Sequence, residues 1–316
     1  MGLEMDQEFI TKLGPFLQTL KDVPRPEVHD IEGRRARYAG MEGLPPIIPQ
    51  GVTFEIIHIP TTDGATLPMY HFRKDNSVSS EDLSAAVIHA HGGGLITLSP
   101  AVSVGRLAEI VSDTGVQAFS VDYRLAPEHP YPAALDDCWT CLTWIHSNHR
   151  NLHVDPKRIA VMGESAGGCL AAALAIRARD AKLSPPIAHQ ILSSPMLDDR
   201  TNAEVPGDLQ LWDAVDNLTA WTAYLQKTPG GDDVPALAAP GRLEDASGLP
   251  PLYLDTSQFD LFVRENLNYV QKFIDGGVKT ECHLYPGLPH GFDGILPNHS
   301  VSQALEENRK RILKLL

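Results

Sequence analysis

Cysteine is scarce in this chain. Its 316 residues include only Cys138, Cys141, Cys169 and Cys282, too few to indicate a disulfide scaffold. Cys138 and Cys141 have the C-x-x-C spacing of redox and zinc motifs, but they lie in a segment with an amphipathic helical pattern. Because no second ligand pair accompanies them, we interpret both as buried packing residues on one helix face.

The chain also lacks long apolar runs. No stretch is long enough to span a bilayer, and the acidic N-terminus, Met1 to Asp6, is not followed by the apolar core of a signal peptide. Asp6 stands where a myristoylation signal requires serine or threonine. These features predict a cytoplasmic protein with no stable membrane association.

The chain has fewer basic residues than acidic ones, 26 against 40. The net charge is −14, and no basic patch stands out to offset it, which argues against nucleic acid and anionic membranes as partners. No H-E-x-x-H motif or paired Cys/His ligand set occurs, so the sequence predicts neither a metal site nor a cofactor. The hydrophobic content of 43% is ordinary for a globular protein, and the length allows one large α/β domain or two small ones.

Apolar runs and helical patterns alternate from residue 85 onward, which predicts a doubly wound, mostly parallel eight-stranded sheet flanked by helices. The first two strands alternate with polar residues and resemble an edge hairpin, whereas the middle ones are continuous apolar runs typical of buried parallel strands. The predicted strands are 52–59, 67–73, 85–91, 117–123, 159–163, 188–193, 252–257 and 280–285. The predicted helices are 4–20, 102–114, 134–147, 166–180, 264–275 and 300–315.

Two segments interrupt this alternation, residues 1–50 and 200–240. The second carries apolar residues at roughly helical spacing, namely Leu209, Leu211, Trp212, Leu218, Trp221, Tyr224 and Leu225. We expect the two segments to form a helical cap over the carboxyl edge of the sheet, where open α/β sheets bind ligands. The α/β domain would then comprise 51–199 and 241–316, and the alternative is that the extra helices pack beside the sheet.

The most informative motif is Gly163-Glu164-Ser165-Ala166-Gly167, between an apolar run and a helical run. It has the form and context of a nucleophile elbow, G-x-S-x-G, in which a strained turn lifts the serine hydroxyl clear of the sheet. Glycines are needed because the flanking backbones approach closely. An isolated match could also be a serine in a Gly-rich turn, so the context has to decide.

A second glycine motif supplies that context. His91-Gly92-Gly93-Gly94 follows a predicted strand directly, and consecutive glycines allow backbone N–H groups to face a substrate oxygen. We expect the N–H groups of Gly92, Gly93 and Ala166 to form an oxyanion hole, in which one donor typically contributes about 3–4 kcal/mol.

A serine nucleophile needs a base, and folds with this elbow place it late in the chain. His290 follows the last predicted strand at a loop and is the leading candidate. His299 is interpreted as part of a helix cap, His283 as a strand residue, and His89 as a structural residue ahead of the glycine loop.

The acid that orients the histidine should follow strand 252–257. Asp260 lies in that loop and is preferred. Asp255 is expected within the strand and Glu265 within the next helix.

These motifs, with the block Asp122-Tyr123-Arg124-Leu125-Ala126-Pro127-Glu128 and its continuation to Ala134, resemble the hormone-sensitive-lipase-like (bacterial family IV) esterases from about residue 50 to the end. The resemblance implies an α/β-hydrolase fold with a helical cap and cofactor-free hydrolysis of short- to medium-chain carboxylic esters. It implies the triad Ser165, Asp260 and His290, the oxyanion donors Gly92, Gly93 and Ala166, and a homodimer through the last strand.

The chain departs from the family pattern in three places. The acid motif reads Asp260-Leu261-Phe262-Val263-Arg264-Glu265, Glu164 replaces a commoner aspartate or threonine, and Leu95 follows the glycines where an aromatic residue is frequent. Leu95 and Glu164, with Trp212 and Trp221, are predicted to line the substrate pocket. Three charged residues of the long block, Asp122, Arg124 and Glu128, are expected to brace loops.

The sequence thus predicts a serine carboxylic-ester hydrolase that acts on small-molecule short- to medium-chain or aryl esters through an acyl-enzyme. The alternatives are a natural-product esterase, a lactonase or an acyltransferase, because all of them would use the same residues. A non-catalytic receptor is a lesser alternative, because plant gibberellin receptors, which resemble this family, lack the catalytic histidine and this chain has His290.

Overall fold

The computed structural model describes residues 3–21, 24–41, 47–61, 64–75, 83–203 and 211–316. Over these residues the chain forms one eight-stranded sheet, in the order β1-β2-β4-β3-β5-β6-β7-β8. The strands are β1 (Val52–Pro60), β2 (Thr66–Lys74), β3 (Ser84–Ala90), β4 (Gln117–Val121), β5 (Val154–Glu164), β6 (His189–Ser193), β7 (Leu252–Phe259) and β8 (Thr280–Pro289).

The main helices of the described residues are α1 (Gln7–Lys21), α2 (Ile31–Tyr38), α3 (Val104–Thr114), α4 (Ala133–Asn148), α5 (Ala166–Asp180), α6 (Ala214–Leu225), α7 (Val263–Asp275), α8 (Phe292–Ile295) and α9 (Ser300–Leu313). Short 3-10 turns occur at Ala39–Met41, Pro100–Ser103 and Pro240–Arg242.

The predicted sheet is confirmed. β1 and β2 form an antiparallel hairpin, β2 pairs antiparallel with β4, and the remaining neighbours are parallel. The largest differences from the predicted bounds are in β5, which begins at Val154 and pairs there with Ser84, and in β8, which continues to Pro289 and pairs there with Phe259. The extension of β8 matters for the site, because it brings the ends of β7 and β8 level.

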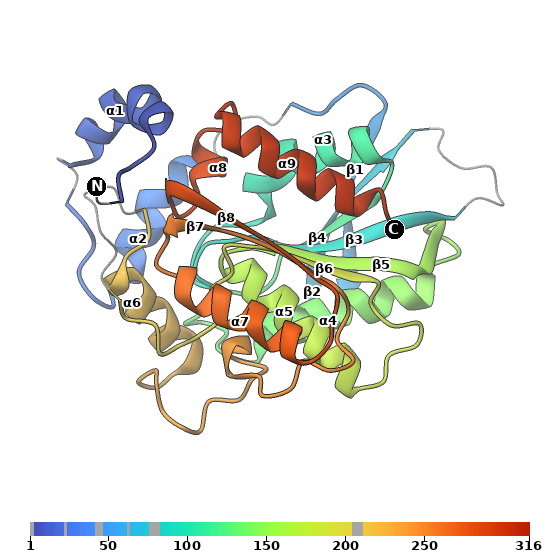
Figure 1. Cartoon of the computed structure of the whole chain (residues 1–316). Coiled ribbons are helices and arrows are strands. Elements are labelled where there is room, and N and C mark those ends of the chain that lie inside the picture. The colour runs from blue at the N-terminus through green and yellow to red at the C-terminus, as the bar shows by residue number, and fades with distance from the viewer. Residues whose placement is uncertain (1–2, 22–23, 42–46, 62–63, 76–82, 204–210) are drawn as a thin grey trace.

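Helices cover both faces of the sheet, as the alternation predicts (Figure 1). On one face α3 and α9 bury residues such as Leu107 and Ile312 against Val87, Ala118 and Met162 of the strands. On the other face α4, α5 and α7 pack in a larger apolar cluster. The middle strands β3, β4, β6 and β7 are therefore buried on both faces, which explains why they read as continuous apolar runs.

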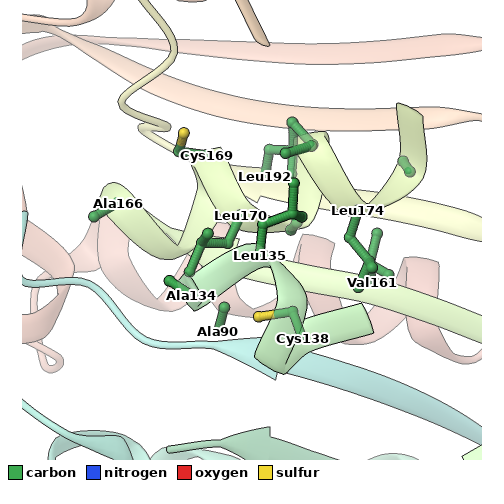
Figure 2. Packing of buried hydrophobic residues seen from close by; sticks show 14 of the residues in the cluster. Ala90, Ala134, Leu135, Cys138, Val161, Ala166, Cys169, Leu170, Leu174 and Leu192 are labelled. Carbon is green, nitrogen blue, oxygen red and sulfur yellow. The ribbon is translucent and has the colours of Figure 1, made fainter. Parts of the chain in front are cut away.

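Helix α5 lies at the centre of the larger cluster and is buried along nearly its whole length. Figure 2 shows Leu170 of this helix beside Ala134 and Leu135 of α4, with Cys138 further along α4 in the same cluster. Both Cys138 and Cys141 are fully buried, and burial raises the pKa of each thiol. The C-x-x-C pair thus packs in the core, as predicted.

Strand β5 and helix α5 meet at a turn with no room for side chains. A β-carbon added at Gly163 would lie 2.2 Å from the carbonyl oxygen of Gly167, and one added at Gly167 would lie 1.9 Å from the carbonyl oxygen of Ala90. Both are far inside van der Waals contact, so glycine is required at these two positions. This contact locks β3, β5 and α5 together.

Helices α2 and α6 lie together at the left of Figure 1. A buried ion pair joins Arg34 of α2 to Asp216 of α6 at 2.8 Å, and the Tyr38 hydroxyl donates to the Leu211 carbonyl at 2.9 Å. Helix α2 was not predicted, because a Pro-rich connection was expected there. The division into a cap and an α/β domain stays a prediction, and Leu209 of the proposed cap lies outside the described residues.

Helix α1 packs elsewhere, against the end of β8 and the start of α9. Phe9 and Leu13 contact Leu288, Phe292 and Leu305. In the part of the chain that the structure covers, no helix combines the length and apolar character needed to cross a membrane.

Replacing Gly167 by alanine should destabilise the fold by at least about 3 kcal/mol, because the new β-carbon collides with backbone rather than with a movable side chain. Gly105 is the control: it lies in α3 with no atom within 4 Å of an added β-carbon. Gly105→Ala should be neutral or stabilising by up to about 1 kcal/mol. Urea unfolding of both variants measures the difference, and equal stability would contradict the steric argument.

Candidate functional site

Ser165 occupies the turn between β5 and α5 in a strained conformation. Its φ of 54° and ψ of −119° are unfavourable for a residue with a side chain. The turn is fixed by backbone hydrogen bonds: the Ser165 N–H donates to the Ser193 carbonyl at 2.9 Å, and the Ser165 carbonyl accepts from Met196 at 3.0 Å. The side chain is therefore held in place at the carboxyl end of β5.

His290 comes directly after β8 and faces this serine. Its Nε2 atom lies 2.9 Å from the Ser165 hydroxyl. Gly291 follows with a φ of 69°, which turns the chain into α8 immediately after the histidine. The edge of the Phe262 ring packs against the imidazole with centroids 5.1 Å apart, which fixes the ring plane.

Asp260 comes directly after β7 and contacts the other side of the imidazole. Its Oδ2 atom lies 2.8 Å from His290 Nδ1, and its Oδ1 atom accepts from the Phe262 N–H at 2.8 Å. The strand register explains the contact, because Phe259 pairs with Pro289 and the next residues of the two strands are Asp260 and His290. The structure thus brings Ser165, His290 and Asp260 together in one hydrogen-bonded series.

The charged groups around His290 make its ring a better proton acceptor. Burial opposes protonation of the ring, but the charge and hydrogen bond of Asp260, together with the charge of Asp293, outweigh it and raise the pKa of His290 above 6.5. With Nδ1–H donated to Asp260, the neutral ring presents the Nε2 lone pair to the serine hydroxyl.

The alternative acids are engaged elsewhere. Asp255 lies within β7 and holds Arg309 in a buried ion pair at 2.8 Å. Glu265 lies within α7 and accepts from the Leu197 N–H at 2.5 Å and from the Thr201 hydroxyl. Neither carboxylate bonds to His290, which agrees with the preference for Asp260.

The alternative histidines also have structural partners. His299 caps α9 and lies 2.9 Å from Asp6. His283 sits in β8 beside Glu281 at 2.7 Å. His89 is buried between the Ser120 hydroxyl and the Glu164 carboxylate, 2.8 Å from each, as its structural interpretation requires.

The glycine loop lies against the elbow. A β-carbon added at Gly92 would be 3.5 Å from the Ser165 β-carbon, so the loop is next to the serine. Within the described part of the chain, the N–H groups of Gly92, Gly93 and Ala166 donate to no acceptor. Three backbone N–H groups of the glycine loop and the elbow are therefore free to donate to another group.

His91 and Tyr123 brace this loop, a role that the sequence did not reveal. The two rings stack with centroids 4.2 Å apart, and the Tyr123 hydroxyl donates to the His91 carbonyl at 2.7 Å. Burial lowers the pKa of His91 to about 3, so the ring is neutral and its Nδ1–H can donate to the Gly92 carbonyl at 2.7 Å. His91 belongs to the glycine motif and Tyr123 to the block that begins at Asp122. Nothing in either motif signals that the two rings stack, because the contact joins separate parts of the chain.

The four predicted pocket residues have different surroundings. Leu95 is 1% exposed and Trp221 is 0% exposed, so both side chains are buried in the larger apolar cluster. Their role in a substrate pocket stays a prediction. Trp212 lies on the glycine loop, because a β-carbon added at Gly94 would be 2.2 Å from its ring.

Glu164 lies in a cluster of charged side chains. Its carboxylate is 2.8 Å from His89 and 3.2 Å from Arg106. These partners give it a structural role, and its predicted pocket role stays a prediction. The bracing role of two charged loop residues is confirmed: Arg124 pairs with Asp137 and Glu128 with Arg35, both at 2.7 Å.

Comparison with known families and proteins agrees with this geometry. Residues 87–294 match a family model described as the alpha/beta hydrolase fold. Among curated proteins, the chain is 36% identical over 212 residues to esterase LipI and 38% identical over 221 residues to carboxylesterase NlhH, both of Mycobacterium tuberculosis. These alignments cover 66% and 65% of the chain, and 65% and 66% of the two relatives, just under two thirds of their length.

Solved structures cover nearly the whole chain. A bacterial heroin esterase superposes with a TM-score of 0.87 at 30% identity, over 98% of this chain and 97% of that one. The esterase LipW from Mycobacterium marinum superposes with a TM-score of 0.75 at 31% identity, over 99% and 91% of the two chains.

Replacing Asp260 by asparagine should lower the pKa of His290, because the substitution removes the charge that stabilises the imidazolium. NMR titration of the thirteen histidines, with His290 assigned by its loss in His290→Gln, measures the shift. The surface variant Asp180→Asn, which removes an exposed carboxylate beside Arg179, is the control and should leave this titration unchanged. An unaltered His290 pKa in Asp260→Asn would contradict the contact.

Proposed function

The chain belongs to the α/β-hydrolase fold family, in its hormone-sensitive-lipase-like branch, and on that premise we propose that it is a serine carboxylic-ester hydrolase. The observation that carries the proposal is the series Ser165–His290–Asp260, with contacts of 2.9 and 2.8 Å, beside three open backbone donors. A strained serine hydroxyl, a base that faces it and a buried carboxylate behind the base are the parts that acyl transfer requires.

Acylation begins when Ser165 Oγ attacks the ester carbonyl carbon and its proton passes to His290 Nε2. The carbonyl π electrons move to the oxygen, and the N–H groups of Gly92, Gly93 and Ala166 stabilise the resulting oxyanion. When this intermediate collapses, the bond to the leaving oxygen breaks and His290 returns the proton to that oxygen. The products are a free alcohol and an acyl ester on Ser165.

Deacylation repeats these steps with water. His290 takes a proton from water, the water oxygen attacks the acyl carbon, and collapse of the second intermediate returns the proton to Ser165 Oγ. Asp260 holds the ring tautomer and stabilises the imidazolium in both halves without exchanging a proton itself. The pKa of His290 lies above 6.5, so the rate should fall as the pH drops through that raised value.

The substrates we propose are short- to medium-chain or aryl esters. The relatives are named as esterases, and one structural neighbour is named for heroin. Trp212, seated on the glycine loop, would limit the space beside the reacting carbonyl. A natural-product esterase, lactonase or acyltransferase would differ only in the alcohol or acceptor used, and the presence of His290 opposes a purely receptor function.

Replacing Ser165 by alanine should reduce kcat for p-nitrophenyl acetate by about 10⁶-fold, because no other group can form the acyl-enzyme. Covalent labelling by a fluorophosphonate should disappear in the same variant, and circular dichroism should show an intact fold. Ser194→Ala provides a matched control at a nearby buried serine. Wild-type turnover or labelling in Ser165→Ala would overturn the assignment.

A series of p-nitrophenyl acetate, butyrate, hexanoate, laurate and palmitate should give the highest kcat/KM among the shorter acyl groups, because Trp212 crowds the glycine loop. Trp212→Ala should shift the preference toward longer chains. Val215→Ala, at an exposed position three residues along, is the control and should leave the profile unchanged. A preference for palmitate in the wild type would contradict the proposed substrate class.

A further inference from the structure

A cluster of five charged side chains lies behind the proposed site. It comprises Arg106 of α3, Glu164 of the elbow, Asp293 of α8, and Glu306 and Arg309 of α9, and is called the bridge cluster below. These residues come from four separate parts of the sequence. The mechanism described above uses none of them, although two are close neighbours of its residues along the chain.

One end of the cluster holds the nucleophile turn. Glu164 directly precedes Ser165, and its two carboxylate oxygens contact Arg106 at 3.2 Å and His89 at 2.8 Å. Burial opposes ionisation of Glu164, but the charges of His89 and Arg106 outweigh it and lower the pKa. The residue before the nucleophile is therefore a carboxylate fixed by two partners.

The other end holds the histidine turn. Asp293 follows His290 by three residues, and its Oδ2 atom lies 2.9 Å from Arg309 Nη1 and 3.8 Å from Arg106 Nη1. The same Nη1 atom of Arg106 thus faces both Glu164 and Asp293. One guanidinium spans the chain segments that carry the nucleophile and the base.

Arg309 is itself anchored to the sheet. Its side chain is fully buried and makes a bidentate pair with Asp255 of β7, at 2.9 and 2.8 Å, and it also donates to the Ser193 hydroxyl. A bidentate, buried guanidinium has little freedom to move. Asp293 is consequently held against a fixed point of the fold.

From these contacts we propose that Asp293 is a positioning residue, which Arg106 and Arg309 hold so that His290 keeps its hydrogen-bond distance to Ser165. The inference rests on the proposed function, since it assigns a role within the same reaction. α8 is a single short helical turn, in which Phe292 packs against Phe9 and Leu13 and Asp293 is the polar side chain. The ion pair between Asp293 and Arg309 is the directional contact that ties this turn to the sheet side of the site. Without its anchor, that turn could shift His290 away from the serine, and small displacements of a base are costly.

The bridge cluster also acts on the charge of His290. The charged groups that face the imidazole are Asp260 and Asp293, and Asp293 is in turn faced by Arg106 and Arg309. Asp293 contributes to the raised pKa of His290. Removing its charge would leave the fully buried Arg309 and the partly buried Arg106 behind the ring with less compensation, which lowers the pKa of His290.

The test compares Asp293→Asn with Glu306→Gln. Glu306 contacts the same two arginines, at 3.1 Å from Arg106 and 3.6 Å from Arg309, but it lies on α9 away from both turns. Each variant removes one negative charge from the same arginines. We expect Asp293→Asn to lower kcat for p-nitrophenyl acetate by about 10- to 100-fold with little change in KM. The acid limb of its kcat/KM profile should move to lower pH.

Glu306→Gln should retain kcat within about twofold and keep the wild-type acid limb, because neither turn loses a contact. If Asp293→Asn does not fold, Arg106→Gln is tested in its place. This variant removes the guanidinium that contacts both Glu164 and Asp293, and it should also lower kcat at constant KM. Asp293→Glu keeps the charge and should retain the wild-type acid limb. The inference is overturned if Asp293→Asn matches the wild type, or if Glu306→Gln loses as much activity.

An NMR titration of His290 in the same variants separates this inference from the proposed function. A wild-type protein that neither cleaves the ester nor reacts with a fluorophosphonate would refute the function alone. The His290 pKa should still be lower in Asp293→Asn than in Glu306→Gln. Equal values in the two variants would refute the inference whether or not the protein is an esterase.

Discussion

The close approach of β3, β5 and α5 is the constraint on which the rest of the site depends. The Gly167 α-carbon lies so near the Ala90 and His91 carbonyls that no side chain fits, and Gly163 meets the Gly167 backbone in the same way. This contact forces the sharp turn that places Ser165 at a positive φ. It also sets the glycine loop after β3 beside the serine, because the end of β3 is part of the contact. A single steric requirement thus positions both the hydroxyl and the open backbone donors.

The other two residues of the series depend on strand register rather than on a local turn. Phe259 and Pro289 are partners in the parallel ladder, so Asp260 and His290 leave the sheet side by side. The hydrogen bond between them needs no long loop, and this keeps its geometry rigid. The acid motif departs from the family pattern, yet register alone places an aspartate opposite the histidine. Position in the sheet, more than sequence motif, decides which carboxylate can orient the base.

Much of this could be predicted from sequence, because local patterns carry it. Glycine spacing identified the elbow, and apolar periodicity gave the eight strands. The position of His290 in the loop after the last predicted strand ranked it above His283, inside that strand, and His299, at a helix cap. Sequence says less where tertiary contacts decide. Leu95 and Trp221 are buried in the apolar cluster, and an apolar side chain carries no local sign of which surface covers it, so their place in a pocket stays a prediction. Helix α2 was hidden by surrounding prolines, and its buried Arg34–Asp216 pair joins residues far apart in the chain.

The bridge cluster holds five charges in or near the core: Arg309 is fully buried and the other four side chains are partly buried. Isolated charges in a core are costly, and a buried pair often stabilises no more than an apolar packing of the same volume would. Stability alone therefore does not account for Arg106 and Arg309. The directionality of the ion pairs explains their presence better. A guanidinium holds its carboxylate partners at defined angles, whereas apolar contacts would allow a short turn to shift along the surface. The two turns joined here, at Glu164 and Asp293, are the ones whose relative movement would separate a nucleophile from its base.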